Sequence, residues 1–217
     1  MLKAHAIHKS YGQLKILKGV DFEVNKGEIV TIVGASGAGK SSLLNILGTL
    51  DKPDSGSVSI GNTDISKLSS KDLSAFRNKQ IGFVFQFHHL LVEFNALENV
   101  CIPALIAGDN KVTAEQKAKV LLNRLGLKDR MTHKPGQLSG GEQQRVAVAR
   151  ALVNNPAMIF ADEPSGNLDS TNANELHHLF SELRDEFHQT FVIVTHNEHL
   201  AELSDRKVLM KDGLIVQ

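Results

Sequence analysis

The chain has 217 residues, of which 41% are hydrophobic and 22% are charged, a composition typical of globular domains. Its 24 basic and 24 acidic residues cancel, so we expect no nucleic-acid partner and no general binding to anionic lipid, because such proteins carry a basic excess. The single cysteine, Cys101, cannot form an internal disulfide and favours a reducing compartment. The N-terminal residues lack the apolar stretch of a signal peptide, and no run of about 18 apolar residues predicts a membrane-spanning helix.

Short strands are predicted in the first third of the chain, where apolar and polar residues alternate or short apolar runs end at turn residues. They cover residues 17–24, 29–34, 55–62 and 79–86. The middle of the chain is predicted to be helical. One helix is expected over 113–126, starting at a capping box of Thr113 and Gln116, and a second over 142–153.

The last third of the chain alternates between strand and helix patterns. Two apolar strands over 157–163 and 190–196 flank a predicted helix over 172–187. The C-terminus is expected to form two short strands around an Asp212–Gly213 turn.

The order of these elements predicts the fold class. Strands that alternate with helices are typical of α/β proteins with a parallel sheet. The N-terminal strands add an antiparallel sheet, and the central helices form a lobe, roughly over 87–155, inserted into the α/β core. No linker, repeat or low-complexity stretch divides the chain, so we expect one domain over residues 1–217.

The stretch GASGAGKSS follows an apolar strand and opens a helix that extends to about residue 50. It matches the phosphate-binding pattern G-x-x-x-x-G-K-[ST] in the strand–loop–helix context that this pattern requires. Its glycines let backbone N–H groups turn toward phosphates, and the helix N-terminus adds partial positive charge. Lys40 is expected to reach the β- and γ-phosphates, and the Ser41 hydroxyl to ligate Mg²⁺. The predicted nucleotide-binding residues of this loop are Gly34, Ala35, Ser36, Gly37, Ala38, Gly39, Lys40, Ser41 and Ser42.

Polar residues also stand at the ends of three other predicted strands, where open α/β sheets bind their ligands. Asp162 ends an apolar run and is expected to hold Mg²⁺ through water, while the next residue, Glu163, could orient and deprotonate the attacking water. His196 could contact the γ-phosphate and that water, and Gln86 suits a contact with water or Mg²⁺. We therefore predict catalytic roles for Glu163, His196 and Gln86. Metal roles are predicted for Ser41, Gln86 and Asp162.

A second glycine-rich loop, LSGGEQQR, precedes another predicted helix. Ser139, Gly140 and Gly141 would offer an anion a hydroxyl, backbone N–H groups and the helix dipole. The loop has no counterpart of Lys40, so it cannot bind a nucleotide unaided. Two interpretations remain open: the serine is a plain N-cap, or the loop completes a nucleotide site on another molecule. The second predicts a head-to-tail dimer in which each of two ATP molecules lies between the Lys40 loop of one copy and this loop of the other.

Six motifs occur in the order and spacing of those of an ABC transporter ATPase: GASGAGKS, Gln86, LSGGEQQ, MIFADE, GNLD and His196. They resemble its Walker A, Q-loop, signature, Walker B, D-loop and H-loop, and the resemblance covers essentially the whole chain. It implies a P-loop NTPase core, an N-terminal antiparallel β subdomain and an α-helical signature lobe, with ATP and Mg²⁺ as cofactors. It also implies that Tyr11 stacks on adenine and that Asp169 contacts the opposite subunit of a dimer.

The stretch after Gln86 lies where ABC ATPases receive the coupling helices of their membrane partner. Its sequence, FHHLLVEFNALENV, resembles that of the ATPases of lipoprotein-releasing systems, although Val92 and Glu93 replace the usual Pro-Asp pair. We therefore expect integral membrane subunits to dock near Phe87–Glu98. The resemblance implies a peripheral ATPase on the cytoplasmic face of a bacterial inner membrane that powers the release of lipoproteins. An ATPase of a related macrolide-exporter or cell-division complex is the alternative.

Overall fold

The computed structural model describes residues 1–216, which form two compact units. The first unit consists of Met1–Ser74 and the C-terminal part of the chain from Ser181 onward. The second unit consists of Ala75–Phe180. The predicted site residues fall in both units.

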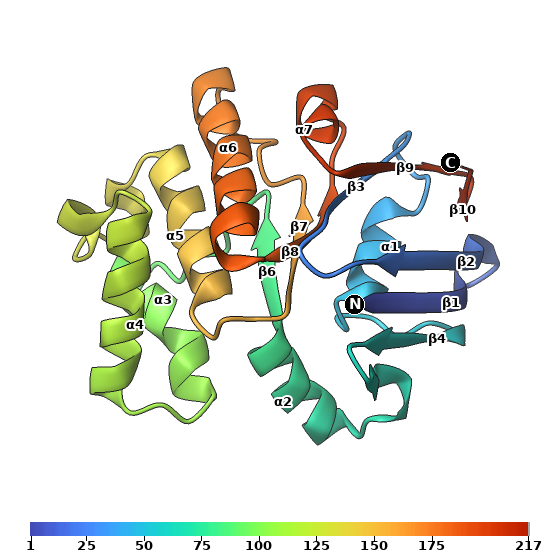
Figure 1. Ribbon diagram of the computed structural model, residues 1–217, viewed down its shortest axis with the longest axis horizontal. Helices are drawn as coiled ribbons and strands as arrows, with labels where there is room; N and C mark the ends of the chain where they lie inside the picture. Colours follow the sequence, from blue (N-terminus) through green and yellow to red (C-terminus); the bar gives the residue numbers. More distant parts are fainter. Residues whose placement is uncertain (217) are drawn as a thin grey trace. The chain divides into compact units, whose positions relative to one another are not determined.

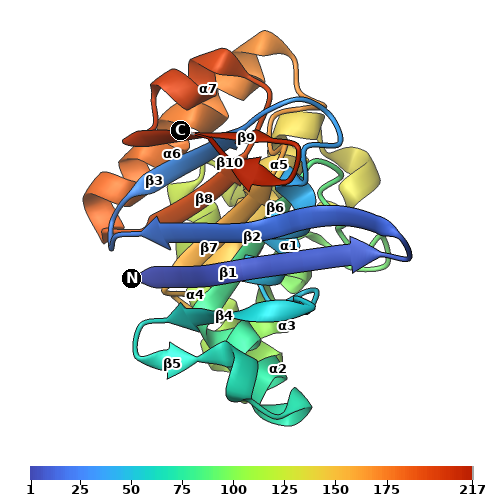
Figure 2. The same ribbon diagram turned by 90° about the vertical axis from the view of Figure 1, so that its right-hand side faces the viewer.

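The first unit contains an antiparallel sheet with the strand order β2-β1-β4-β5, seen in Figure 2. Its strands and the short 3-10 helix that follows them are β1 (Leu2–Tyr11), β2 (Leu14–Val24), β4 (Ser55–Ile60), β5 (Thr63–Asp64) and η1 (Ile65–Lys67). Apolar side chains such as Leu2, Ile7 and Val24 are buried, while most of the polar residues between them face solvent. The predicted N-terminal antiparallel sheet is therefore confirmed.

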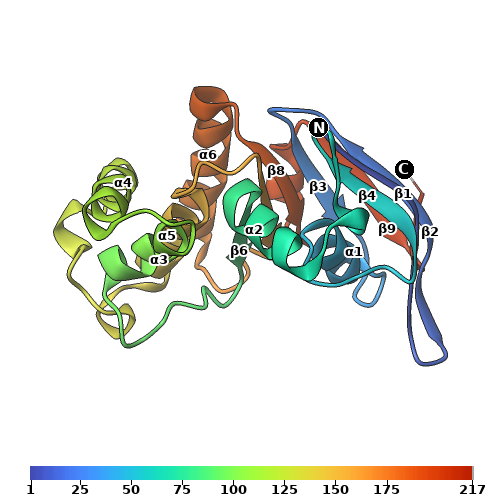
Figure 3. The same cartoon turned by 90° about the horizontal axis from the view of Figure 1, so that it is seen from below.

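The first unit also contains parallel strands in the order β9-β3-β8, with β10 antiparallel to β9. These strands and the helices beside them are β3 (Ile29–Val33), α1 (Lys40–Leu47), β8 (Thr190–Val194), α7 (Glu198–Glu202), β9 (Arg206–Lys211) and β10 (Leu214–Ile215). Helix α1 contacts β8 of this sheet and β2 of the antiparallel sheet (Figure 3). Strands β3 and β8 are buried almost throughout, as is typical of parallel strands covered on both faces.

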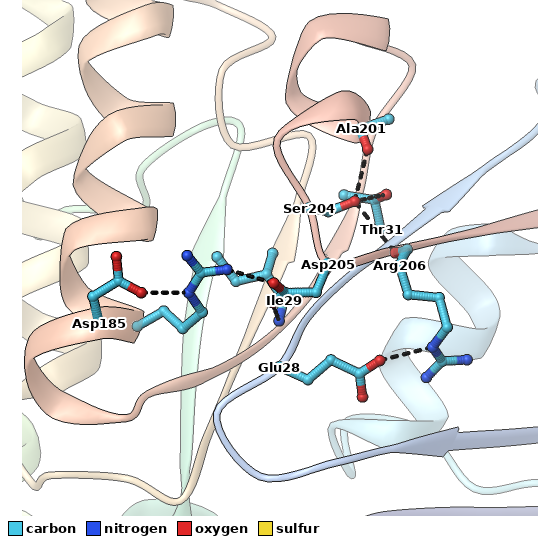
Figure 4. A network of polar contacts seen from close by, with 9 residues as sticks. Glu28, Ile29, Thr31, Asp185, Ala201, Ser204, Asp205 and Arg206 are labelled. Atoms are coloured by element: carbon cyan, nitrogen blue, oxygen red, sulfur yellow. Dashed lines mark hydrogen bonds and ion pairs between the residues drawn. The ribbon is translucent and has the colours of Figure 1, made fainter.

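Charged side chains bond the start of β3 to the start of β9 and to the end of α6 in the same unit (Figure 4). The Asp205 carboxylate accepts hydrogen bonds from the Ile29 backbone N–H, at 2.8 Å, and from the Arg184 guanidinium. Arg206 Nε donates to Glu28 Oε1 at 2.7 Å. These contacts support the parallel pairing of β3 with β9, and β3 is the strand that leads into the predicted phosphate loop.

The second unit combines the parallel strands β6 and β7 with a group of packed helices (Figure 1). Its elements are β6 (Ile81–Phe85), α3 (Ala96–Ile106), α4 (Lys111–Arg124), η2 (Lys128–Arg130), η3 (Pro135–Gln137), α5 (Gly140–Leu152) and β7 (Met158–Asp162). Helices α3, α4 and α5 contact one another, and α5 also contacts β6. Two helices run across the boundaries between the units, α2 (Ser70–Gln80) and α6 (Ser170–Phe187).

The structure corrects several element boundaries. Helix α4 begins after Asn110, whose side chain accepts a hydrogen bond from the Thr113 backbone N–H, so the predicted capping box of Thr113 and Gln116 is wrong. Lys79 and Gln80, predicted to begin a strand, form the last turn of α2. Helices α2 and α3 and strand β1 were not among the predicted elements.

Candidate functional site

The predicted phosphate loop joins β3 to α1 in the first unit. Gly34, Gly37 and Gly39 have φ values of 152°, 78° and 101°, which residues with a side chain rarely adopt. A Cβ atom on Gly34 would lie 2.1 Å from the Met210 carbonyl oxygen, because the loop backbone packs directly against β9. The glycines therefore allow the backbone turns and the close packing that the loop requires, as the sequence pattern predicted.

The N-terminus of α1 is suited to an anion. Lys40 Nζ donates hydrogen bonds to the carbonyl oxygens of Gly34, at 2.7 Å, and Ala35, at 2.9 Å, so its charge lies over the loop. Helices α3, α4, α5 and α7 each have a side-chain N-cap, whereas within the described chain α1 has none and has no acidic residue in its first turn. The N–H groups and the dipole at this helix end are thus combined with a lysine, which is a phosphate-binding arrangement.

His196 lies at the same sheet edge as the phosphate loop. Strands β3 and β8 are parallel, with Ile32 opposite Val194, so the loop after β3 and His196 after β8 both follow the carboxyl ends of neighbouring strands. The His196 side chain is exposed. Within the first unit, the structure therefore brings His196 and the loop to one edge, as predicted.

Tyr11 is the last residue of strand β1 and is 53% exposed. Its hydroxyl donates a hydrogen bond of 2.8 Å to Asp51, which follows α1 in sequence. This hydrogen bond raises the pKa of the Tyr11 hydroxyl above its ordinary value, whereas a contact with the Ser42 hydroxyl acts in the opposite direction. Because Ser42 is the last residue of the predicted phosphate loop, the exposed ring lies beside that loop.

In the second unit, three more predicted residues lie at the carboxyl ends of two neighbouring parallel strands. Strands β6 and β7 pair with Phe85 opposite Asp162, so Gln86 and Glu163 both follow directly after this pair. Glu163 has a φ of 47°, an uncommon backbone conformation for a residue with a side chain. The predicted grouping of Gln86, Asp162 and Glu163 is thus present.

Gln86 is held by Asn167, a residue of the GNLD motif for which the sequence predicted no role. Its Nε2 donates to Asn167 Oδ1 at 2.9 Å, and Asn167 Nδ2 donates back to the Gln86 carbonyl oxygen at 3.2 Å. A Cβ atom on Gly166 would lie 2.8 Å from Gln86 Nε2, so the glycine in GNLD allows this approach. The turn is fixed to the end of β7 by a backbone hydrogen bond from the Gly166 N–H to the Glu163 carbonyl oxygen, at 3.0 Å.

The donor atoms at this edge suit a hard cation. Mg²⁺ is usually bound by one or two carboxylates together with water and substrate phosphates, and only rarely by protein ligands alone. Asp162 and Gln86 supply a carboxylate and an amide oxygen, and the Ser41 hydroxyl is exposed in the first unit. Over residues 1–216, no cluster of three His, Cys, Asp or Glu side chains forms a metal cage. Asp162 and Gln86 therefore offer oxygen ligands of the kind that Mg²⁺ prefers.

The second glycine-rich loop begins helix α5. The Ser139 hydroxyl accepts from the Glu142 backbone N–H at 3.2 Å, and Glu142 Oε2 accepts from the Ser139 N–H at 2.8 Å, which completes a capping box. A Cβ atom on Gly141 would lie 2.1 Å from Asn172 Oδ1, so packing against α6 explains that glycine. Gly140 is exposed, and a Cβ atom there would make only an ordinary contact of 3.7 Å with Leu168. Ser139 is thus an N-cap, while packing within the chain does not explain Gly140.

A buried glutamine, missed from the sequence, connects α5 to both strand ends. Gln144 Nε2 donates to the carbonyl oxygens of Pro164, at 2.6 Å, and Phe85, at 3.4 Å, and its Oε1 bonds the His88 ring. A polar residue among the apolar positions of an amphipathic helix is the signal that could have identified it. Through Gln144, helix α5 contacts the carboxyl end of β6 and the segments that follow β6 and β7.

The predicted docking segment, Phe87–Glu98, has several large apolar side chains in solvent. Phe87 is 67% exposed and Val92 66%, and Leu91 and Phe94 are also exposed. Grouped exposed apolar residues are typical of interaction surfaces. No helix in residues 1–216 is long and apolar enough to span a bilayer.

Comparison with known proteins identifies the family. The family model described as ABC transporter matches residues 17–166. The chain belongs to the ABC transporter family. It is therefore an ATP-binding ABC ATPase with the predicted α/β fold, and the resemblance of its motifs to this family is confirmed.

Similar proteins match this ABC ATPase over its full length. It is 63% identical over 216 residues to the lipoprotein-releasing system ATP-binding protein LolD of Cytophaga hutchinsonii, covering 100% of the chain and 99% of the relative. It is 62% identical to the protein of the same name from Bacteroides thetaiotaomicron, with 99% of both chains covered. Among solved structures, it resembles the dimeric ATP-binding cassette MJ0796 in a post-hydrolysis state bound to ADP and Pi, with 40% identity and a TM-score of 0.91. That match covers 100% of this chain and 97% of the other.

Proposed function

We propose that this ABC ATPase powers the release of lipoproteins from a bacterial inner membrane, acting through integral membrane partners on the cytoplasmic face. The observation that carries the proposal is the 63% identity, over the full length of both chains, with a relative named for the lipoprotein-releasing system. The docking segment supports the same substrate class, because its sequence resembles that group in all but a few positions. Residues 1–217 would act as a single ATPase domain.

In the proposed reaction, the phosphate loop and Lys40 bind the phosphates of ATP, and Tyr11 stacks on adenine. Bound Mg²⁺, held by Ser41, Asp162 and Gln86, would neutralise phosphate charge. Glu163 then takes a proton from the attacking water, and His196 donates a hydrogen bond to the γ-phosphate. The positive φ of Glu163 supports this role, since uncommon backbone conformations cluster at active sites.

The active form in this proposal is a dimer of two copies that enclose two ATP molecules. Ser139, Gly140 and Gly141 of one copy would contact the γ-phosphate bound by the other copy. The exposed Gly140 supports this arrangement. Its own chain leaves room for a side chain there, so the close approach of a second copy would account for the glycine. The dimeric state of the solved relative MJ0796 also supports it.

The function is tested by depleting the protein in the bacterium that encodes it and restoring it from a plasmid. We expect depletion to leave outer-membrane lipoproteins in the inner-membrane fraction. The wild-type gene should restore their sorting, whereas Glu163→Gln should not. The matched control is Glu202→Gln, the same change at an exposed glutamate of α7, which should restore sorting fully.

A biochemical arm follows the same reaction with purified components. The ATPase is purified with the membrane subunits that bind it and placed in vesicles that contain a lipoprotein, and ATP-dependent release to the medium is measured. Normal lipoprotein sorting after depletion, combined with greater macrolide sensitivity or a division defect, would contradict the proposal and favour the corresponding relative.

A further inference from the structure

We infer that Asp51 and Lys9 position the ring of Tyr11 for the nucleobase, so that ATP affinity depends on this network as well as on the aromatic face. Both would be positioning residues, since they act through Tyr11. The inference rests on the proposed stacking of Tyr11 on adenine.

One carboxylate joins the three side chains. The Tyr11 hydroxyl donates to Asp51 Oδ2 at 2.8 Å, and Lys9 Nζ donates to Asp51 Oδ1, also at 2.8 Å. Lys9 Nζ donates further to the Lys52 carbonyl oxygen at 2.7 Å. Each Asp51 oxygen is therefore bonded to a different side chain of β1, and the phenol is held at its far end.

Lys9 also determines which face of the ring is open. Its ammonium lies over the Tyr11 ring, 5.2 Å from the centroid, within the range of a cation–π contact. Lys9 is only 8% exposed, and a lysine is rarely buried this far unless it is paired. Tyr11 as a residue is nevertheless 53% exposed, so we assign the face opposite Lys9 as the one that a nucleobase can cover.

Asp51 links this ring to the phosphate-binding helix. The backbone N–H groups of Leu50 and Asp51 donate to the Asn45 carbonyl oxygen of α1, at 2.8 and 3.2 Å. The turn that carries the Asp51 carboxylate is therefore hydrogen-bonded to α1, the helix that begins at Lys40. The network holds the aromatic ring at a defined position relative to the phosphate loop, which lowers the ordering cost when a nucleotide binds both.

The charge states support the network at neutral pH. Burial alone would raise the pKa of Asp51, but the hydrogen bonds from Lys9 and Tyr11 outweigh it and hold that pKa below its ordinary value. The hydrogen bond to Asp51 raises the pKa of Lys9. At neutral pH, a carboxylate and an ammonium therefore face each other while the phenol keeps its proton.

The experiment measures dissociation constants for Mg-ATP and for inorganic triphosphate, which has no base. Tyr11→Phe keeps the aromatic face but removes the hydroxyl, and Asp51→Asn keeps the side-chain shape but removes the charge. We expect each to weaken ATP binding about three- to tenfold, the usual cost of ordering one side chain on binding, and to leave triphosphate affinity unchanged. In the double variant, Asp51→Asn should add little to Tyr11→Phe, because both break the same contact. Asp54→Asn is the matched control, since Asp54 bonds the Ser10 backbone N–H instead of the phenol.

The outcomes separate the inference from the function on which it rests. If Tyr11→Ala leaves ATP affinity unchanged, the proposed stacking itself is wrong. If Tyr11→Ala weakens ATP but Tyr11→Phe and Asp51→Asn do not, stacking stands and the positioning inference is overturned. Equal losses of ATP and triphosphate affinity in Asp51→Asn would also overturn it, because Asp51 would then act through the fold of α1.

Discussion

Asn99 organises the proposed membrane-docking segment, and its replacement by alanine should loosen that segment. The side chain is fully buried in α3. Its Oδ1 accepts from the Leu91 N–H at 2.8 Å, and its Nδ2 lies 3.1 Å from the Leu91 and Phe94 carbonyl oxygens and 3.0 Å from that of Asn95. One amide thus bonds the backbone of the loop at Leu91, Phe94 and Asn95.

The size of the effect follows from this geometry. The amide accepts one hydrogen bond, and its two hydrogens are shared among three carbonyl oxygens, so about three bonds are lost. At about 1 kcal/mol each, the free energy of unfolding should fall by roughly 3 kcal/mol in Asn99→Ala. With a typical urea m-value of about 1–3 kcal/mol per molar, the unfolding midpoint should fall by roughly 1–3 M.

Two measurements test this reasoning. Urea unfolding gives the midpoint, and hydrogen exchange shows whether protection is lost over residues 87–95. Basal ATPase activity should persist, whereas stimulation by the membrane subunits should fall. Asn123→Ala, the same change at an exposed position of α4, should alter neither quantity. An unchanged midpoint together with unchanged exchange over 87–95 would refute the role given to Asn99.

Three further predictions concern the nucleotide site. Lys40→Ala should abolish nucleotide binding in a calorimetric titration, whereas Glu163→Gln should keep ATP binding and lower hydrolysis about 10²–10⁴-fold, so a near-normal rate would exclude Glu163 as the base. A mixture of Lys40→Ala and Gly140→Asp chains should regain part of the ATPase activity, because the mixed dimer rebuilds one intact site; no recovery despite proven mixed dimers would contradict shared sites. Since the chain has one tyrosine and no tryptophan, an ultraviolet titration reports Tyr11 alone. Asp51→Asn should lower the pKa of Tyr11, because the carboxylate stabilises the protonated phenol, and an unchanged or raised pKa would speak against the hydrogen bond.

The elements predicted well are those whose pattern is set by burial. Strands β3, β7 and β8 are short apolar runs, and each is buried along nearly its whole length. Helix α2 could not be predicted in the same way because none of its residues is buried, so it has no apolar stripe. In β1, Ala6 has a φ of 48° and the register shifts between Ala4 and Ile7, which interrupts the alternation. Helix α3 was missed because it contains Pro103, a residue that usually interrupts a helix. Its capping box of Asn95 and Glu98 is a sequence signal that would have indicated its start.

In the candidate site, too, residues in local motifs could be predicted, whereas contacts between distant parts of the chain could not. The phosphate loop and the strand-end residues could be predicted because each depends on a short motif at the end of an apolar strand. Their supporting partners could not, because they come from distant parts of the chain. Asp51 is 40 residues from Tyr11, and Asn167 is 81 residues from Gln86. Ordinary polar residues in separate segments carry no local pattern that pairs them.

The capping role of Ser139 bears on the question of whether its loop also serves a second molecule. A hydroxyl that accepts a hydrogen bond, as Ser139 does from the Glu142 N–H, still has its own hydrogen to donate. The negative charge of Glu142, which would repel a phosphate, is offset by Arg130, whose Nε donates to Glu142 Oε1 at 2.8 Å. The two interpretations are therefore compatible: the cap orients the serine, and the exposed Gly140 leaves the helix end accessible. Ser139→Ala should then cost stability through the lost cap and ATP-dependent dimerisation through the lost donor. Ser139→Asp, which caps equally well but adds negative charge, should restore only the stability.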